Sequence, residues 1–180
     1  MLNQYYHKLD KKLLTTETEN QIVKIAIDNP NEFVPYKSQR TGKLDNNWYL
    51  VRGPLRSVVQ LQNLMQSCVL NCYPLIMRHF PNVQVPIHKD DPNARNCVLI
   101  NPIMPKTDYV PTNFYTDFDE SSKVESINFS DGLPALVNLQ ALHNLYNNDN
   151  LRINLQLCFR ESFETVQNLL IEDKLFSQKK

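Results

Sequence analysis

Val83-Gln-Val-Pro-Ile-His-Lys-Asp90 is the stretch on which the fold and site predictions depend, because it predicts a strand that runs into a histidine and an aspartate. Pro86 cannot donate to a strand ladder, so it restricts this segment to an edge strand or a strand start. Alternate residues of a strand share a face, so His88 and Asp90 are both expected to point into a barrel from one strand. Asp91 then points the other way, as an exposed neighbour or a turn former.

The segments around this stretch predict a mainly β core with flanking helices. Residues 48–52, 97–100, 133–139 and 151–159 are typical of strands, and residues 16–28, 55–70 and 162–176 of helices. Residues 73–80 fit either type, residues 114–129 fit two edge strands or a long loop, and residues 37–47 fit a loop. Helices followed by many short strands and proline-rich turns indicate an all-β core with helices packed beside it. With no repeat or linker, residues 1–180 are predicted to form a single domain.

Composition restricts the class of protein and its surroundings. Nineteen Lys and Arg balance nineteen Asp and Glu, which argues against a nucleic acid as the main partner.

The first residues show no signal peptide, and no apolar run approaches the roughly 20 residues that span a bilayer, so we expect a cytoplasmic protein without a membrane partner. Frequent Asn suggests AT-rich coding, as in a virus or a low-GC bacterium. The four cysteines are too sparse for a disulfide scaffold and are expected to be reduced and mostly buried.

Two more residues complete a chemically meaningful set with His88 and Asp90. His143 follows a gap of 52 residues (91–142) and comes after the predicted strand at 133–139. Two imidazoles and one carboxylate form a ligand set that leaves one face of a six-coordinate iron open. Zinc more often closes a tetrahedron with thiolates or a third histidine, and no cysteine lies near these residues in sequence. Arg152 lies on the polar side of the alternating segment 151–159, at a point where a fully apolar interior would reject a charge.

The order His88-x-Asp90, a long gap, His143 and then Arg152 resembles the 2-oxoglutarate- and Fe(II)-dependent oxygenase family, especially its small prolyl-hydroxylase-like members. The resemblance implies a double-stranded β-helix, that is, a cupin-like jelly roll. It also implies that His88, Asp90 and His143 hold Fe(II), and that Arg152 binds the far carboxylate of the co-substrate 2-oxoglutarate. A guanidinium suits that task because it can grip a carboxylate with two parallel hydrogen bonds.

The co-substrate site departs from the family pattern at one position. The family often has Ser or Thr two residues after the arginine, whereas this chain has Asn154, which can still hydrogen-bond a carboxylate. Tyr73 and Tyr115 are weaker candidates for a second contact with 2-oxoglutarate.

The resemblance implies an O2-consuming dioxygenase that hydroxylates a C–H bond and releases succinate and CO2, with ascorbate as a supporting reductant. Asp90, in place of Gly or Ala, favours hydroxylation over halogenation. The expected substrate is a protein or peptide side chain, such as Pro, Asn or Asp, or a small amino-acid-like molecule. A nucleobase ranks third, because no basic stretch interleaved with aromatic residues is present.

Each candidate residue, taken alone, has an ordinary structural explanation. A His-x-Asp pair is most often a surface or capping pair, His143 could be a core or loop histidine, and Arg152 could be a salt-bridged surface residue. The metal prediction therefore rests on their conjunction. His7 and His79 lack such context and are expected to be structural or exposed, and Arg95 is better suited to a salt bridge than to a substrate contact.

Two other kinds of protein are compatible with the same residues. One is a non-catalytic jelly-roll binding or structural protein that retains the metal motif, with the tyrosine-rich segment 109–118 as a binding surface. The other is a cupin-type isomerase or dioxygenase that uses a metal but no 2-oxoglutarate.

Overall fold

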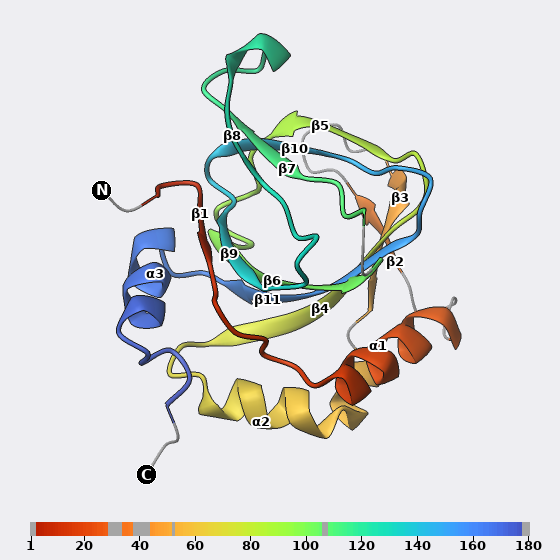
Figure 1. The fold of residues 1–180 in the computed structure, drawn as a ribbon, viewed down its shortest axis with the longest axis vertical. Coiled ribbons are helices and arrows are strands. Elements are labelled where there is room, and N and C mark those ends of the chain that lie inside the picture. The colour runs from red at the N-terminus through yellow and green to blue at the C-terminus, as the bar shows by residue number, and fades with distance from the viewer. Residues whose placement is uncertain (1–2, 29–33, 38–43, 52, 106–107, 178–180) are drawn as a thin grey trace.

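Two antiparallel β-sheets packed against each other form the centre of the computed structural model, which describes residues 3–28, 34–37, 44–51, 53–105 and 108–177 (Figure 1). The seven-stranded sheet has the order β1 (Tyr6–Lys8), β9 (Ala135–Asn138), β6 (Cys97–Met104), β11 (Arg152–Phe159), β4 (Cys72–His79), β3 (Leu44–Val51) and β2 (Val34–Lys37). The four-stranded sheet has the order β5 (Gln84–His88), β10 (Leu142–Tyr146), β7 (Thr112–Tyr115) and β8 (Lys123–Ile127). The chain crosses between the sheets repeatedly, so neighbouring strands are mostly distant in sequence.

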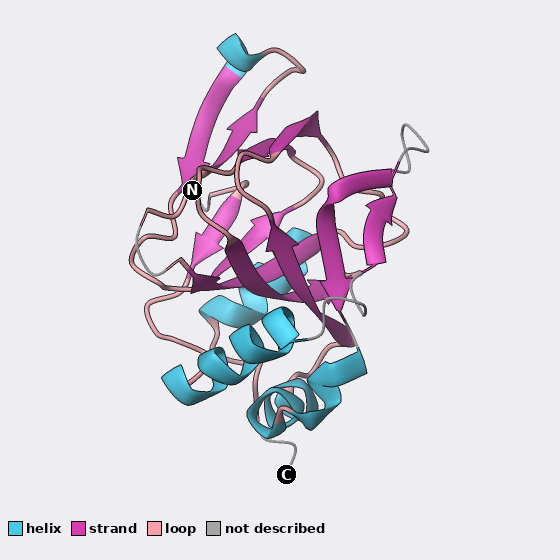
Figure 2. Cartoon of the chain, turned by 90° about the vertical axis from the view of Figure 1, so that its right-hand side faces the viewer, coloured by secondary structure: helices cyan, strands magenta, loops and turns pink. Residues whose placement is uncertain are grey.

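The helices lie on one side of the large sheet, and the small sheet lies on the other (Figure 2). They are α1 (Thr16–Asp28), α2 (Val59–Ser67) and α3 (Phe163–Ile171). Of the two 3-10 turns, η2 (Gly53–Ser57) precedes α2, and η3 (Glu120–Ser122) lies between β7 and β8 of the small sheet. Helix α1 begins after Thr15, whose hydroxyl accepts a hydrogen bond from the Thr18 N–H at 3.3 Å. None of the helices in the described ranges is long and apolar enough to cross a membrane.

Strand β11 lies at the centre of the large sheet and shows why the molecule has two distinct interiors. All eight of its residues are buried. Its odd-numbered residues are apolar and pack with the helices, in the same cluster as Ile22 and Ala26 of α1. Its even-numbered residues Arg152, Asn154 and Gln156 face the space between the sheets. The alternation predicted for residues 151–159 therefore separates a helix-covered apolar core from a polar cavity.

The predicted elements agree with the structure in most places and differ in a few. Helix 16–28 is confirmed as α1, and most of the segment 73–80 belongs to strand β4. Residues 114–129 contain the end of β7 and all of β8, of which only β8 is at an edge. The helix predicted at 55–70 is divided into η2 and α2.

The predicted loop at 37–47 is shorter than expected, because β3 already begins at Leu44. Residues 38–43 and Arg52, at the end of the strand predicted at 48–52, lie outside the described residues.

Candidate metal centre

A β-bulge in strand β5 turns His88 toward the space between the sheets. Leu145 of β10 pairs with Val85, and His143 pairs with His88, so β10 advances two residues while β5 advances three. Side chains alternate along a regular strand, so without the extra residue His88 would face away from Val85. With the bulge, both side chains line the same cavity. Pro86 lies inside the bulge of this edge strand, where its missing N–H is tolerated.

The third member, Asp90, does not lie on the strand as predicted. Strand β5 ends at His88, and Asp90 lies in the irregular segment that follows. Its backbone N–H donates to the carbonyl of Leu139 at 3.1 Å, which fixes the chain next to the turn that leads into β10. The carboxylate still points inward and is buried.

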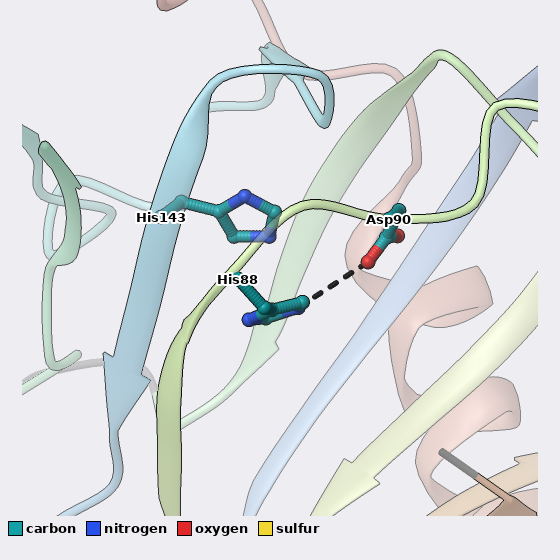
Figure 3. A group of neighbouring side chains, drawn as sticks. All are labelled: His88, Asp90 and His143. Carbon is teal, nitrogen blue, oxygen red and sulfur yellow. Dashed lines mark ion pairs between the residues drawn. The ribbon is translucent and has the colours of Figure 1, made fainter. Parts of the chain in front are cut away.

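Three side chains converge: His88 from the end of β5, Asp90 from the segment after it, and His143 from β10 (Figure 3). One coordinating atom from each lies within 4.8 Å of the others, and this is the one such group of His, Cys, Asp or Glu among the described residues. The imidazole centroids are 4.4 Å apart. His88 keeps 23% of its side chain exposed, whereas Asp90 and His143 are buried. The group is therefore reached from solvent on the His88 side.

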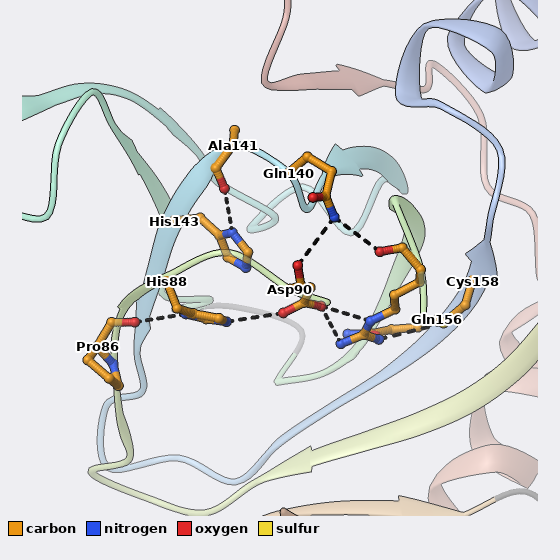
Figure 4. A network of polar contacts seen from close by, with 9 residues as sticks. Pro86, His88, Asp90, Gln140, Ala141, His143, Gln156 and Cys158 are labelled. Carbon is orange, nitrogen blue, oxygen red and sulfur yellow. Dashed lines mark hydrogen bonds and ion pairs between the residues drawn. The ribbon is translucent and has the colours of Figure 1, made fainter. Parts of the chain in front are cut away.

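Hydrogen bonds to backbone carbonyls orient both imidazoles (Figure 4). Nδ1 of His88 lies 2.8 Å from the Pro86 carbonyl oxygen, and Nδ1 of His143 lies 3.0 Å from that of Ala141. A carbonyl can only accept, so each Nδ1 carries the hydrogen, and each neutral imidazole keeps its lone pair on Nε2. Metal-bound histidines usually have this arrangement, in which the other ring N–H donates to a backbone carbonyl or a carboxylate.

The contact between His88 and Asp90 indicates a place for a cation. Nε2 of His88 lies 3.3 Å from Oδ1 of Asp90. With the His88 ring neutral, these are two acceptors in contact, and their repulsion is removed when a cation, either a proton or a metal ion, lies between them. The donor set therefore fits a divalent ion such as Fe(II), which prefers imidazole and carboxylate ligands.

Protonation of the buried members favours metal binding as well. Burial is the main cause that lowers the pKa of His143 to about 4, so this imidazole is neutral near pH 7, as a ligand must be. Burial alone would raise the pKa of Asp90, but the positive charge of Arg95 is the largest of the opposing causes, which together hold this pKa well below its usual range. Asp90 is therefore an anion. The predicted salt bridge of Arg95 is confirmed, with 2.8 Å between Nη2 and Asp90 Oδ2.

A cavity of about 50 Å³ adjoins the three side chains and is lined by residues of both sheets. This volume exceeds the roughly 10–15 Å³ that one water molecule needs. Its walls carry apolar side chains and a row of polar side chains from β11, namely Arg152, Asn154 and Gln156.

Arg152 and Asn154 are the chemically unusual residues of this cavity. Arg152 is only 2% exposed, and no carboxylate of the described residues forms an ion pair with it. Its Nη1 makes a long hydrogen bond of 3.4 Å to the Val110 carbonyl, and its guanidinium lies 4.2 Å from the centre of the Tyr109 ring. Nε of Arg152 and both amide atoms of Asn154 are buried and have no hydrogen-bond partner within the part of the chain that the structure describes. Such groups are costly when unpaired, so their presence indicates a site for an anionic, hydrogen-bonding ligand.

The two predicted tyrosines lie elsewhere. The Tyr73 hydroxyl donates to the Ala94 carbonyl at 3.1 Å, and Tyr115 on β7 pairs with Leu142 of β10. Neither residue is among those that line the cavity. Their contact with a co-substrate stays a prediction.

Two polar residues of the cavity were not predicted as site residues. His79 is buried, lines the cavity and pairs across the β4–β11 ladder with Arg152. Burial, followed by the charge of Arg152, keeps the pKa of His79 well below its ordinary value, so this imidazole is neutral. Thr112 of β7 lines the same cavity. No sequence signal could have found them, because both positions depend on which strands become neighbours.

Comparisons with known proteins identify the fold. No protein-family model and no curated protein sequence matches the chain. Among solved structures, it is similar to a prolyl hydroxylase from Trichoplax adhaerens in complex with a peptide of the hypoxia inducible factor oxygen degradation domain (TM-score 0.64, 10% identity, 93% of this chain and 87% of that chain covered). It is also similar to the viral collagen prolyl hydroxylase of Paramecium Bursaria Chlorella virus-1 in complex with 2-oxoglutarate (0.51, 15%, 87% and 95%).

A third similar structure is an α-ketoglutarate-dependent epimerase from nogalamycin biosynthesis, SnoN (TM-score 0.58, 10% identity, 86% of this chain and 75% of that chain covered). At these identities the likeness shows the fold alone. These structures confirm the predicted double-stranded β-helix with flanking helices. At the level of the fold, they also confirm the resemblance to prolyl-hydroxylase-like oxygenases from which it was predicted. Because the same fold also serves an epimerase, the choice of reaction depends on the site.

Proposed function

We propose that this protein is an Fe(II)- and 2-oxoglutarate-dependent oxygenase that hydroxylates a C–H bond. The observation that carries the proposal is the convergence of His88, Asp90 and His143 beside a cavity that contains the buried Arg152, which has no carboxylate partner among the described residues. The three converging side chains would hold the iron. With 2-oxoglutarate and O2, the iron would supply the oxidising power to insert oxygen into a C–H bond, with release of succinate and CO2.

The protein's own residues would bind and orient the co-substrate. Arg152 would grip the far carboxylate of 2-oxoglutarate, and the amide of Asn154 would donate a further hydrogen bond. Val98, Val137 and Leu139 supply apolar walls that limit the entry of water. A ligand carboxylate at this position would accept hydrogen bonds from Nε of Arg152 and Nδ2 of Asn154, two donors that an apolar ligand would leave without partners.

For the substrate, we propose a protein or peptide side chain or a small amino-acid-like molecule. A substrate would reach the metal from the side on which His88 is partly exposed. A peptide is supported by a similar protein, the Trichoplax adhaerens hydroxylase, whose solved complex contains one. The balanced net charge gives no support for a nucleic acid substrate.

We propose a cytoplasmic location and a single domain over residues 1–180. All four cysteines are free thiols, and Cys68, Cys97 and Cys158 are buried. A reducing compartment would preserve these thiols and help to keep iron ferrous, and ascorbate would have the same effect in an assay.

The first test needs no knowledge of the substrate. Addition of 2-oxoglutarate to the anaerobic Fe(II)-loaded protein is expected to produce a visible metal-to-ligand absorption band, because the keto acid binds the iron directly. Admission of O2 with ascorbate and a panel of peptides and amino acids is then expected to produce succinate, which is quantified chromatographically.

The outcomes of this test separate the three kinds of protein. Neither band nor succinate would contradict the proposal and favour a non-catalytic jelly-roll binding protein. Oxygen consumption or isomerisation without 2-oxoglutarate, unchanged in an Arg152→Ala variant, would favour a cupin-type enzyme instead.

A further inference from the structure

Arg95 connects the candidate metal ligand Asp90 to the central strand of the large sheet. It lies in the segment between β5 and β6, and its side chain is buried. On one side, its Nε and Nη2 atoms each lie 2.8 Å from the same oxygen, Oδ2 of Asp90. On the other side, its Nη1 donates to Oε1 of Gln156 at 2.8 Å and lies 3.6 Å from Sγ of Cys158. The guanidinium therefore has partners at three of its nitrogens.

We propose that Arg95 is a positioning residue that restricts Asp90 to one-oxygen coordination of the metal, an inference that rests on the proposed function. A carboxylate can bind a metal through one oxygen or through both. Here Oδ2 already accepts two charge-assisted hydrogen bonds, whereas Oδ1 faces His88. Coordination by both oxygens would require Oδ2 to leave Arg95 and would leave a buried guanidinium without its anion, which is costly.

Asp90 needs such a restraint because its backbone lies outside any strand. A ligand on a strand is oriented by the ladder, but Asp90 follows the end of β5. Gln140 adds to the restraint: its Nε2 lies 3.4 Å from the carbonyl oxygen of Asp90 and 3.3 Å from that of Arg95 (Figure 4). Gln140 therefore holds the backbone of both Asp90 and Arg95 next to the turn that precedes β10.

The restraint determines how many positions of the metal remain open. An octahedral ion has six positions, and three single-atom ligands leave three for other molecules. A keto acid that chelates through two atoms, together with O2, needs all three of them. If Asp90 bound through both oxygens, one of these positions would be lost. Arg95 would therefore control co-substrate binding through Asp90.

Metal affinity alone does not test this role, because two effects of removing Arg95 oppose each other. Loss of a nearby positive charge strengthens attraction of a dication, whereas loss of the restraint weakens pre-organisation. The number of coordinated waters has no such ambiguity. We therefore use Mn(II) as the probe, because it is octahedral, redox-stable in the assay and paramagnetic, so that water-proton relaxation counts its exchangeable waters.

The wild-type protein with Mn(II) is expected to show three exchangeable waters, and the Arg95→Gln variant two. Arg95→Lys keeps the charge but loses the contacts to Gln156 and Cys158, so it is expected to show two waters as well. The affinity of the Mn(II)-loaded variants for 2-oxoglutarate is expected to fall by about 10–100-fold, the range usual for residues that orient metal ligands. Lys89→Gln is the matched control, since it removes one positive charge from an exposed residue beside Asp90 and should preserve the wild-type values.

Each outcome decides the inference. Two waters on the wild-type protein would contradict it without any variant, and so would three waters with unchanged 2-oxoglutarate affinity in Arg95→Gln. If Arg95→Lys kept three waters and the wild-type affinity for 2-oxoglutarate, the positive charge alone would explain the loss in Arg95→Gln. That result would overturn the positioning role of Arg95. Absence of Mn(II) binding to the wild-type protein would contradict the proposed function together with this inference, whereas the other results concern Arg95 alone.

Discussion

His143→Ala is expected to weaken Fe(II) binding by more than about 100-fold, beyond the 10–100-fold usual for residues outside the metal shell, and to abolish succinate formation. His143 is the one predicted ligand on β10, and it is buried and neutral. The described residues contain no other His, Cys, Asp or Glu positioned to replace it. Removal of this donor leaves two ligands on one side of the ion, which is too few to hold it against water. Anaerobic titration calorimetry with Fe(II) measures the change.

His7→Ala is the matched control for this variant, because His7 lies on β1 and takes no part in the cluster. It should bind Fe(II) as the wild-type protein does. Circular dichroism and thermal unfolding of the metal-free proteins verify that both variants fold. Retention of wild-type Fe(II) affinity by a folded His143→Ala protein would show that the ligand assignment is wrong.

Arg152→Met is expected to change binding and stability in opposite directions. The affinity for 2-oxoglutarate should fall by about 2–5 kcal/mol, the usual loss when one partner of a buried charge pair is removed. The metal-free and ligand-free protein, in contrast, should become more stable by about 1–3 kcal/mol, because a buried charge without a carboxylate partner is replaced by an apolar side chain of similar length. The lost contact with the Tyr109 ring reduces this gain without reversing it.

Two measurements check the Arg152 prediction. Urea unfolding without metal or 2-oxoglutarate gives the free energy of unfolding, and titration of the anaerobic Fe(II) protein by its absorption band gives the affinity. Arg152→Lys serves as the control, because it keeps the charge and should keep the stability near that of wild type while losing the two-pronged grip on a carboxylate. A variant with Met at 152 that is less stable than wild type, or that binds 2-oxoglutarate equally well, would contradict the role given to this arginine.

The parts of the fold that could be predicted from the sequence are those whose pattern is local. Strand β11 was predictable because its apolar and polar residues alternate without interruption, and the two faces then meet chemically different surroundings. Helix α1 was predictable because its apolar positions recur at helical spacing. The proposed ligand set could be suggested from the sequence as well, since the chemistry of imidazole and carboxylate does not depend on the fold.

The parts that could not be predicted depend on pairing between distant segments. Strand β10 contains polar residues such as Asn144 and is a strand because β5 and β7 pair with it on both sides. For the same reason, the position of His79 beside Arg152 and the anchoring of Arg95 on Gln156 have no local signature. The two-residue spacing of His88 and Asp90 predicted that both lie on one strand. Their side chains do lie close together, but β5 ends before Asp90 and carries an extra residue.

Because of that extra residue, the direction of the His88 side chain depends on whether the number of residues between Val85 and His88 is odd or even. Loss or gain of one amino acid between Val85 and His88 would present the imidazole on the outer surface, although every ligand would still be present in the sequence. A change of two would restore its direction. During evolutionary divergence this segment is therefore free to exchange its residues but is constrained in how many it contains.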